Sequence, residues 1–293
     1  MKIYDLLIIG AGPAGLGAVI QAAHLGLAHL LIEREEPQSR LLLARKVENF
    51  PLAGEGGLSG PELYCSLVAQ ARNSGVNIIT GPVSSVKNDK GIFIIAAKHN
   101  TYKSKAVILS TGLLPKKLSR IVAPQELEDK KLFYRWTDIP RGRRKGGILV
   151  IGGGEVAFDQ ACSLAEKGFE ITLAVRGSND RVFDSLRREA KESGVSVKYN
   201  TFIEKITEDG NGISAFLRNG ERKILRRYDY CLAAIGSTRN VPVLSSSARQ
   251  CLNAGIYLAG DLAHPQQKQA AIAFGDGIKK TTMAYNFIRE NKE

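Results

Sequence analysis

Two glycine-rich turns, each between an apolar strand and a helix, constrain the fold of this chain more than any other feature. The first, Gly10–Gly15, has the spacing G-x-G-x-x-G and connects the apolar run Asp5–Ile9 to the helical segment Leu16–Leu25. In such a turn the first glycine permits the bend, the second admits a pyrophosphate, and the third lets the helix pack closely on the strand. The helix N-terminus then offers unpaired N–H groups to the phosphates. Glu33, 23 residues after the first glycine, is placed to accept hydrogen bonds from ribose hydroxyls.

The same order of elements recurs about 140 residues later. The strand Gly147–Ile151 leads into the turn Gly152–Ala157, with the spacing G-x-G-x-x-A, and then into the helix Phe158–Lys167 and the strand Glu170–Val175. Such a spaced duplication is an internal repeat of one nucleotide-binding βαβ element. The sequence therefore predicts an α/β protein with two Rossmann-like, three-layer dinucleotide-binding domains.

The length of 293 residues also favours two domains. The stretch 116–144 is rich in proline and charge, and the stretch 240–250 combines proline with serine, so both are interpreted as crossings between domains. This predicts that residues 115–240 form a domain inserted into another domain made of residues 1–114 and 241–293. Further elements of the outer domain are expected as strands at 106–110 and 255–261 and as a long helix at 267–288.

The second turn lacks the acid that follows the first. Counting 23 residues from Gly152 reaches Val175, and Arg176 and Arg181 follow. A missing carboxylate with arginine nearby favours an adenosine that carries a 2′-phosphate, and so NADPH over NADH. The alternative is that both arginines are ordinary surface charge.

Charge and cysteine content limit the classes of partner. The net charge is +12, and two basic clusters account for part of it. Such clusters attract acidic partners, although a solvated surface is an equally good interpretation. No aromatic interleaving or nucleic-acid motif accompanies them, so no nucleic-acid partner is expected. The clusters are Lys130, Lys131, Arg135, Arg141, Arg143, Arg144 and Lys145, and Arg218, Arg222, Lys223, Arg226 and Arg227.

Cellular location is inferred from what the sequence lacks. No apolar run is long enough for a membrane span, and the first residues run directly into the first predicted strand without a leader. We therefore expect a cytoplasmic protein with no membrane partner. The four cysteines form no C-x-x-C pair and no metal-ligand spacing, so they are expected to be reduced, mostly buried, and not part of a metal site.

Taken with their order, the motifs resemble those of the low-molecular-weight thioredoxin reductase family of FAD and NAD(P)H flavoproteins. The resemblance covers nearly the whole chain. It is carried by GAGPAG at 10–15, VENFP at 47–51, LSGPEL at 58–63, STG at 110–112, GGGEVA at 152–157, AIG at 234–236, GIYLAGD at 255–261 and KQAAIAFGDG at 268–277. Ferredoxin–NADP reductases of the same superfamily are similar in lacking a redox dithiol.

The resemblance implies FAD in the outer domain and a nicotinamide dinucleotide in the inserted one. It places Glu33 at the adenosine ribose, Asn49 beside the flavin, Asp261 at the ribitol–phosphate region, and the helix start at 268–270 against the flavin pyrimidine edge. It also implies a homodimer. The complete set of residues expected to bind the cofactors is Gly10, Gly12, Pro13, Ala14, Gly15, Glu33, Arg34, Asn49, Thr111, Gly112, Gly152, Gly154, Glu155, Val156, Ala157, Arg176, Arg181, Ile235, Gly236, Gly260, Asp261, Lys268, Gln269 and Ala270.

Three departures from the family pattern bear on function. The redox Cys-x-x-Cys is replaced within 134–138, where arginine and aspartate occupy the cysteine places and cannot form a thiolate. The family's HRR is Val-Arg-Gly at 175–177, and its Gly-Gly-Gln loop near the flavin is Gln-Ser-Arg-Leu at 38–41. Trp136, which stands where the dithiol would be, is a candidate cover for the flavin or a packing residue. Asp138 is a candidate proton donor or a surface residue.

These departures favour a flavin oxidoreductase whose acceptor is not a dithiol. An acidic ferredoxin or flavodoxin would be drawn to the basic segment. The alternatives are a small-molecule acceptor such as a quinone, a disulfide compound or oxygen, and a non-catalytic FAD-binding sensor or assembly partner.

Overall fold

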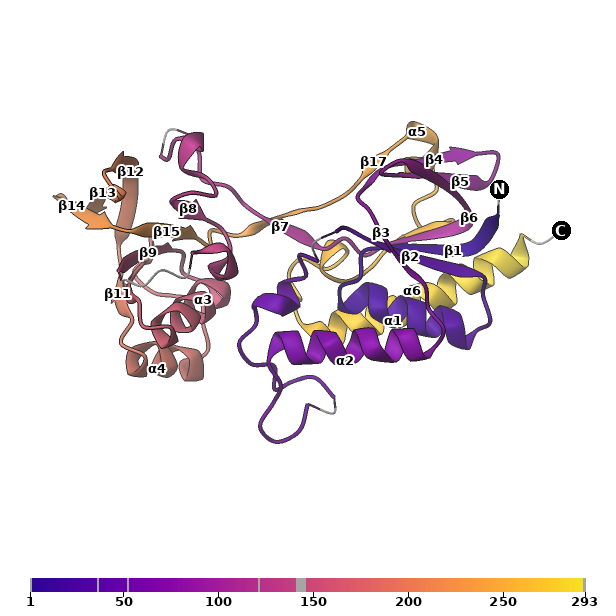
Figure 1. The fold of residues 1–293 in the computed structure, drawn as a ribbon, viewed down its shortest axis with the longest axis horizontal. Coiled ribbons are helices and arrows are strands. Elements are labelled where there is room, and N and C mark those ends of the chain that lie inside the picture. The colour runs from indigo at the N-terminus through magenta and orange to yellow at the C-terminus, as the bar shows by residue number, and fades with distance from the viewer. Residues whose placement is uncertain (1, 36, 52, 121, 141–145, 292–293) are drawn as a thin grey trace. The chain divides into compact units, whose positions relative to one another are not determined.

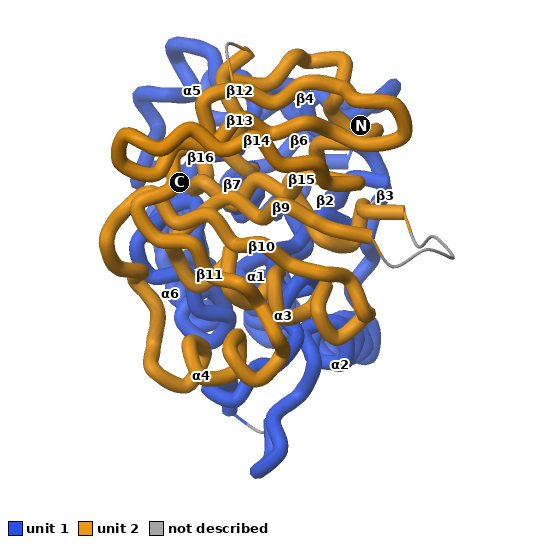
Figure 2. The backbone as a smooth tube through the Cα atoms, turned by 90° about the vertical axis from the view of Figure 1, so that its left-hand side faces the viewer, with its two compact units in different colours: residues 1–114, 239–293 blue, residues 115–238 orange. Residues whose placement is uncertain are grey.

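A computed structural model describes residues 2–35, 37–51, 53–120, 122–140 and 146–291. The chain forms two compact units, coloured separately in Figure 2. Unit 1 consists of Met1–Leu114 and Arg239–Glu293, and unit 2 of Pro115–Thr238. The chain leaves unit 1 along β7 (Leu113–Pro115) and returns along β16 (Ser237–Arg239), and these two strands pair with each other.

Unit 1 is built on a parallel sheet that continues into an antiparallel one. β1 (Ile3–Ile9) pairs in parallel with β2 (His29–Glu33) and with β6 (Asn100–Leu109), and β2 pairs in parallel with β3 (Ile78–Thr80). β18 (Ile256–Leu258) lies parallel to the end of β6. The first half of β6 turns antiparallel to β5 (Ile92–Ala97), which pairs with β4 (Val83–Asp89), and β17 (Val243–Leu244) closes that edge.

The alternation of side chains along β1 gives unit 1 three layers. Leu6 and Ile8 face a core shared with the helices, whereas Leu7 and Ile9 face a core shared with β4, β5 and α5 (Ser246–Gln250). Figure 1 shows α1 (Pro13–His24), α2 (Gly60–Asn73) and α6 (Ala270–Glu290) together on one face of the sheet. Because both faces of β1 are covered, its sequence is continuously apolar rather than alternating.

The helix α1, which follows the first glycine turn, is held in place by close contact with α6. A Cβ added at Gly17 would lie 2.4 Å from the carbonyl oxygen of Phe274, and one at Gly277 would lie 1.9 Å from that of Ala14. The Thr281 hydroxyl donates to the carbonyl of Ala18 at 3.0 Å. Any side chain with a Cβ at these two glycines would push α1 and α6 apart. The two glycines therefore allow α1 to pack closely on α6, which holds the start of α1 in place.

Unit 2 repeats this architecture. β9 (Gly147–Ile151) pairs in parallel with β10 (Glu170–Ala174) and β15 (Tyr230–Ala233), and the sheet ends in β11 (Ser196–Lys198) and β8 (Leu132–Phe133). One face packs on α3 (Glu155–Glu166) and α4 (Asp184–Glu192). The other packs on an antiparallel meander of β12 (Thr201–Asp209), β13 (Gly212–Asn219) and β14 (Arg222–Tyr228), as Figure 1 shows.

Both predicted crossings contain more structure than the sequence suggested. The stretch 116–144 holds β8, which pairs with β15, and two short 3₁₀ helices, η2 (Gln125–Leu127) and η3 (Trp136–Asp138). The stretch 240–250 holds β17, paired with β4, and α5. In each case a few apolar side chains in a mostly polar stretch are buried, among them Leu132, Phe133 and Leu244. These short strands and helices could not be predicted from the polar composition of the two segments.

Within the part of the chain that the structure describes, no helix has the length and apolar character needed to span a bilayer.

Candidate dinucleotide sites

The first glycine turn joins β1 to α1 and requires glycine at two positions. Gly10 has a φ of +103°, and a Cβ there would lie 2.6 Å from the carbonyl oxygen of Ser110. A Cβ at Gly15 would lie 1.7 Å from the carbonyl oxygen of Gly10 itself. Gly12, in contrast, would meet only the Ser39 hydroxyl, at 3.6 Å. The first and third glycines therefore serve packing, and the second leaves room in front of the helix terminus for a ligand.

Glu33 ties the end of β2 to this turn. One carboxylate oxygen accepts the N–H of Ala11 at 2.6 Å, and the other accepts the N–H of Arg34 at 2.7 Å. Each oxygen keeps a further acceptor position, so the carboxylate can still receive ribose hydroxyls. The acid is thus fixed by the backbone of the turn before any ligand arrives.

An open hollow of about 470 Å³ lies just beyond Glu33 along the chain. It is lined by Arg34, Glu35, Pro82 and Lys98, and Lys98 forms an ion pair with Glu35. Only Arg34 of these four residues was among those expected to bind a cofactor. Pro82 follows β3 and Lys98 follows β5, so the sequence offered no spacing that would have grouped them.

A second group of side chains meets near Gly12. The segment Arg40–Leu43 forms a 3₁₀ helix, η1, capped by Ser39, and Arg40 lies 3.3 Å from the carboxylate of Asp261 in η4 (Gly260–Leu262). Burial raises the pKa of Asp261, and the positive charges of Arg40 and Lys268 oppose that rise. Asp261 was predicted as a site residue, whereas Arg40 was noted only as part of a departure from the family pattern.

Other predicted residues of unit 1 lie at the ends of β6 and β18. The Thr111 hydroxyl donates to the carbonyl of Asn240, and Gly112 has a φ of +65°. The N–H of Gly260 donates to Asp276 of α6 at 2.8 Å, a contact for which the sequence gave no signal. The helix α6 begins at Ala270 with Gln269 as its N-cap, whereas Asn49, Lys268 and Gln269 are exposed.

The second glycine turn joins β9 to α3 with a similar backbone and different side chains. Gly152 has a φ of +153°, and a Cβ there would lie 2.5 Å from the carbonyl oxygen of Ala234. Among the described residues, and apart from its own chain neighbours, no atom lies within 4 Å of a Cβ added at Gly154, so these residues leave the turn open at the start of α3. A Cβ at Gly153 would lie 2.9 Å from Val175, which is buried. The place that Glu33 takes in unit 1 is here filled by an aliphatic side chain.

The two predicted arginines both lie in the segment between β10 and α4. The main chain of Arg181 docks on the glycine turn, because its N–H donates to the carbonyl of Gly153 at 2.9 Å. The side chains of Arg176 and Arg181 are exposed, and among the described residues no ion pair to either is found. At the same turn Glu155 and Val156 begin α3 and are exposed. Of the two residues that follow β15, Ile235 is half-buried and Gly236 is exposed.

Trp136 and Asp138 occupy one short element of unit 2 but differ in burial. Trp136 is half-buried against the core beneath α3, with Lys167 4.7 Å from its ring centre. The main-chain N–H of Trp136 donates to the side-chain carbonyl oxygen of Gln160 at 2.8 Å. Asp138 is exposed and accepts a hydrogen bond from the Thr137 hydroxyl at 3.0 Å. Within unit 2 these contacts match the packing and surface interpretations of the two residues.

The cysteines do not share one environment. Cys162 and Cys231 are buried, Cys251 is half-buried and Cys65 is exposed. Burial raises the pKa of the Cys231 thiol, which disfavours its thiolate. Arg141, Arg143, Arg144 and Lys145 of the first basic cluster lie outside the described residues.

Comparison with known proteins agrees with this geometry. Residues 4–277 match the family model of pyridine nucleotide-disulphide oxidoreductases. The chain is 27% identical to a thioredoxin reductase of Listeria monocytogenes, over 100% of this chain and 96% of the relative. It is 28% identical to ferredoxin–NADP reductase 1 of Lysinibacillus sphaericus, over 98% and 90%. A crystal structure of Lactococcus lactis thioredoxin reductase superposes with a TM-score of 0.87 at 24% identity, covering 98% and 99%.

The chain therefore belongs to the pyridine nucleotide-disulphide oxidoreductase family. It is an oxidoreductase of the thioredoxin reductase-like flavoprotein type, with the α/β fold of the solved thioredoxin reductases. The family resemblance and the fold class predicted from the sequence are confirmed.

Proposed function

We propose that this protein is a FAD-dependent NADPH oxidoreductase that passes electrons to an acceptor other than a Cys-x-x-Cys dithiol. The observation that carries the proposal is the pair of glycine turns, one in each unit, each ending a buried parallel strand and opening a helix N-terminus. Two such turns in one chain suit an enzyme that binds two dinucleotides.

Unit 1 fits FAD. The space in front of Gly12 suits a pyrophosphate, the fixed carboxylate of Glu33 suits an adenosine ribose, and the hollow bounded by Arg34 and Pro82 suits an adenine ring. Asp261 and Arg40 would then face the ribitol and phosphates. When bound, the flavin supplies the ability to take electrons in pairs and to release them singly or together. The protein's residues bind the dinucleotide, orient it and exclude water.

Unit 2 fits a dinucleotide that carries a 2′-phosphate. The Cβ position of Gly154 is open, which leaves room for a pyrophosphate, and Val175 removes the carboxylate that would select a free ribose hydroxyl. Arg176 and Arg181 offer exposed guanidinium groups beside the same turn, and guanidinium pairs well with phosphate. These features support NADPH over NADH.

The sequence around the missing dithiol and the charge of the chain favour an acidic electron carrier as the acceptor. The sequence contains no C-x-x-C pair, and Arg135 and Asp138 stand where the family has its cysteines. A relative of similar length is a ferredoxin–NADP reductase. With a net charge of +12, the chain would attract an acidic electron carrier such as a ferredoxin or flavodoxin.

The test is an acceptor panel measured with the FAD-loaded protein at fixed NADPH. We expect turnover with ferredoxin or flavodoxin that falls as ionic strength rises, because screening weakens the attraction between opposite charges. Turnover with quinones, disulfide compounds or oxygen, together with no turnover with the acidic proteins, would instead assign a small-molecule acceptor. A flavin that no coenzyme reduces would leave only a non-catalytic role. Homodimer formation and a cytoplasmic location stay predictions.

A further inference from the structure

The segment between β10 and α4 of unit 2 contains one acid among its basic residues. Residues 176–183 read Arg-Gly-Ser-Asn-Asp-Arg-Val-Phe, and the acid is Asp180, directly before Arg181. Arg181 is fixed to the glycine turn through its main chain. A carboxylate in this position would oppose the binding of a phosphate to the two arginines, unless its charge is held elsewhere.

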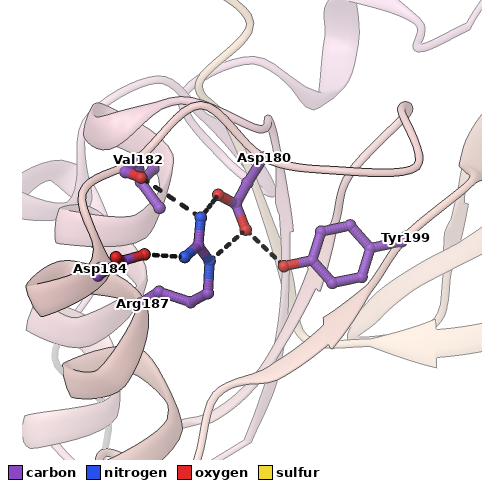
Figure 3. Close-up of polar contacts among 5 residues, drawn as sticks. All are labelled: Asp180, Val182, Asp184, Arg187 and Tyr199. Atoms are coloured by element: carbon purple, nitrogen blue, oxygen red, sulfur yellow. Dashed lines mark hydrogen bonds and ion pairs between the residues drawn. The ribbon is translucent and has the colours of Figure 1, made fainter.

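Figure 3 shows how Asp180 is held. Arg187, on the first turns of α4, donates to both carboxylate oxygens of Asp180, from Nε at 3.1 Å and from a terminal nitrogen at 2.7 Å. The hydroxyl of Tyr199, just after β11, donates to the same carboxylate at 2.5 Å. Only 2% of the Asp180 side chain is exposed. Side chains from two separate elements therefore converge on one buried carboxylate.

The remaining contacts of Arg187 fix its orientation. Its other terminal nitrogen donates to Asp184 in the first turn of α4. The terminal nitrogen that binds Asp180 also reaches the carbonyl of Val182 at 3.4 Å. A guanidinium bound on both edges cannot turn to meet a ligand without giving up these contacts. The hydrogen bond from Arg187 holds the pKa of Asp180 below its ordinary value, so the acid is ionised at neutral pH and balanced by its partner.

We propose that Arg187, assisted by Tyr199, is a positioning residue for coenzyme selection: it holds Asp180 away from the adenosine end of the second site. Arg176 and Arg181 then present an uncancelled positive charge to a 2′-phosphate. The inference rests on the proposed binding of NADPH by unit 2. It identifies Arg187 as the residue that maintains the preference for NADPH over NADH.

The test compares two probes that differ only in the 2′-phosphate, adenosine 2′,5′-bisphosphate and adenosine 5′-monophosphate. Their dissociation constants are measured by calorimetry on the FAD-loaded full chain. In the unmodified protein the bisphosphate binds more tightly. Arg187→Met releases the charge of Asp180 near Arg181, and the ratio of the two constants falls about three- to tenfold, as expected for one extra charge within a Debye length.

Matched variants separate this electrostatic role from a structural one. Asp180→Asn with Arg187→Met removes the released charge and restores the ratio, whereas Tyr199→Phe lowers it by a smaller factor. If Arg187→Met does not fold, Tyr199→Phe decides the matter: a lower ratio supports the inference, and an unchanged ratio overturns it. A purely structural role would weaken both probes alike and leave the ratio unchanged, and that result overturns the inference.

Measurements on the unmodified protein separate the NADPH preference of unit 2 from the role of Arg187. If it binds both probes equally, the NADPH preference fails, and the role of Arg187 fails with it. If it prefers the bisphosphate and Arg187→Met keeps the full preference, only the role of Arg187 fails. A gain in affinity for the monophosphate in Arg187→Met would show that Asp180 is a ribose ligand held in reserve, which also contradicts the proposal.

Discussion

Units 1 and 2 share the order of four parallel core strands, β3-β2-β1-β6 in unit 1 and β11-β10-β9-β15 in unit 2, together with a glycine turn after the corresponding strand. They differ in the side chain that stands behind that turn. In unit 1 the residue that follows the first glycine is Ala11, whose N–H is bound by Glu33 at 2.6 Å. In unit 2 the corresponding residue is Gly153, and Val175 occupies the equivalent place. The backbone of the turn is similar in both units, so the side chain at this position is one clear difference between them.

The turns differ also in how closely the helix approaches the strand. Gly15 leaves no space for a Cβ, whereas its counterpart Ala157 carries one that is buried. The first helix therefore packs directly against the carbonyl of Gly10, whereas the second turn accommodates a methyl group at the corresponding position. The turn of unit 1 therefore tolerates an added methyl group less well than the turn of unit 2, and substitution of Gly15 has the largest expected effect.

Gly15→Ala should abolish FAD retention and destabilise unit 1. The added methyl carbon would lie 1.7 Å from a backbone oxygen that cannot move without displacing β1, and overpacking of this kind costs about 3 kcal/mol or more. The control is Ala157→Gly, which introduces no clash and should cost only about 1 kcal/mol, the usual penalty of glycine relative to alanine in a helix. Urea unfolding and flavin content are measured for both variants. Equal losses of stability in Gly15→Ala and Ala157→Gly would contradict the difference between the two turns.

Glu33→Gln should raise the dissociation constant of FAD about tenfold. The amide loses the charge that accepts the N–H of Ala11, and a hydrogen bond to a charged group contributes about 1.5–3 kcal/mol. Glu290→Gln is the matched control, since Glu290 is an exposed acid at the C-terminal end of α6 and should change affinity little. The measurement is fluorescence titration of the apoprotein with FAD. A similar loss of FAD affinity in both variants would contradict a specific role of Glu33 in binding FAD.

Val175→Glu places the acid of unit 1 into unit 2 and should lower the preference for NADPH over NADH severalfold. The new carboxylate would reach the N–H of Gly153, repel a 2′-phosphate and accept hydrogen bonds from free ribose hydroxyls. Initial rates of flavin reduction by each coenzyme give the ratio. Val175→Gln controls for size without charge. An unchanged ratio in Val175→Glu would mean that this position does not select the coenzyme.

The smallest effect concerns the ion pair near the first turn. Arg40→Gln should destabilise unit 1 by about 0.5–1 kcal/mol at neutral pH, because a partly exposed pair contributes little. Burial raises the pKa of Asp261, so its ionised form costs stability as pH rises above the ordinary value of 3.8, and loss of Arg40 raises the pKa further. The difference between the two proteins should therefore vanish as pH falls and Asp261 protonates in both. Urea unfolding across pH measures it, and a difference that grows toward low pH would reverse the assigned sign.

Local features of the site could be predicted from the sequence, whereas features that join distant elements could not. The glycine turns and Glu33 lie within one βαβ unit, where spacing alone sets geometry. Arg40 and Asp261 are 221 residues apart, and their pairing depends on how η1 folds back over the turn. The contacts among Asp180, Arg187 and Tyr199 likewise require α4 and the end of β11 to meet. The short strands β8 and β17 were missed because a strand of two residues leaves almost no periodic signal in the sequence.

Anaerobic mixing of the purified protein with NADPH and, separately, with NADH, while the visible absorbance of the flavin is followed, tests the central claim most directly. The two-turn account predicts a yellow protein that carries one FAD per chain and bleaches faster with NADPH. A protein that takes up no FAD, or a bound flavin that stays oxidised with both coenzymes, would contradict it.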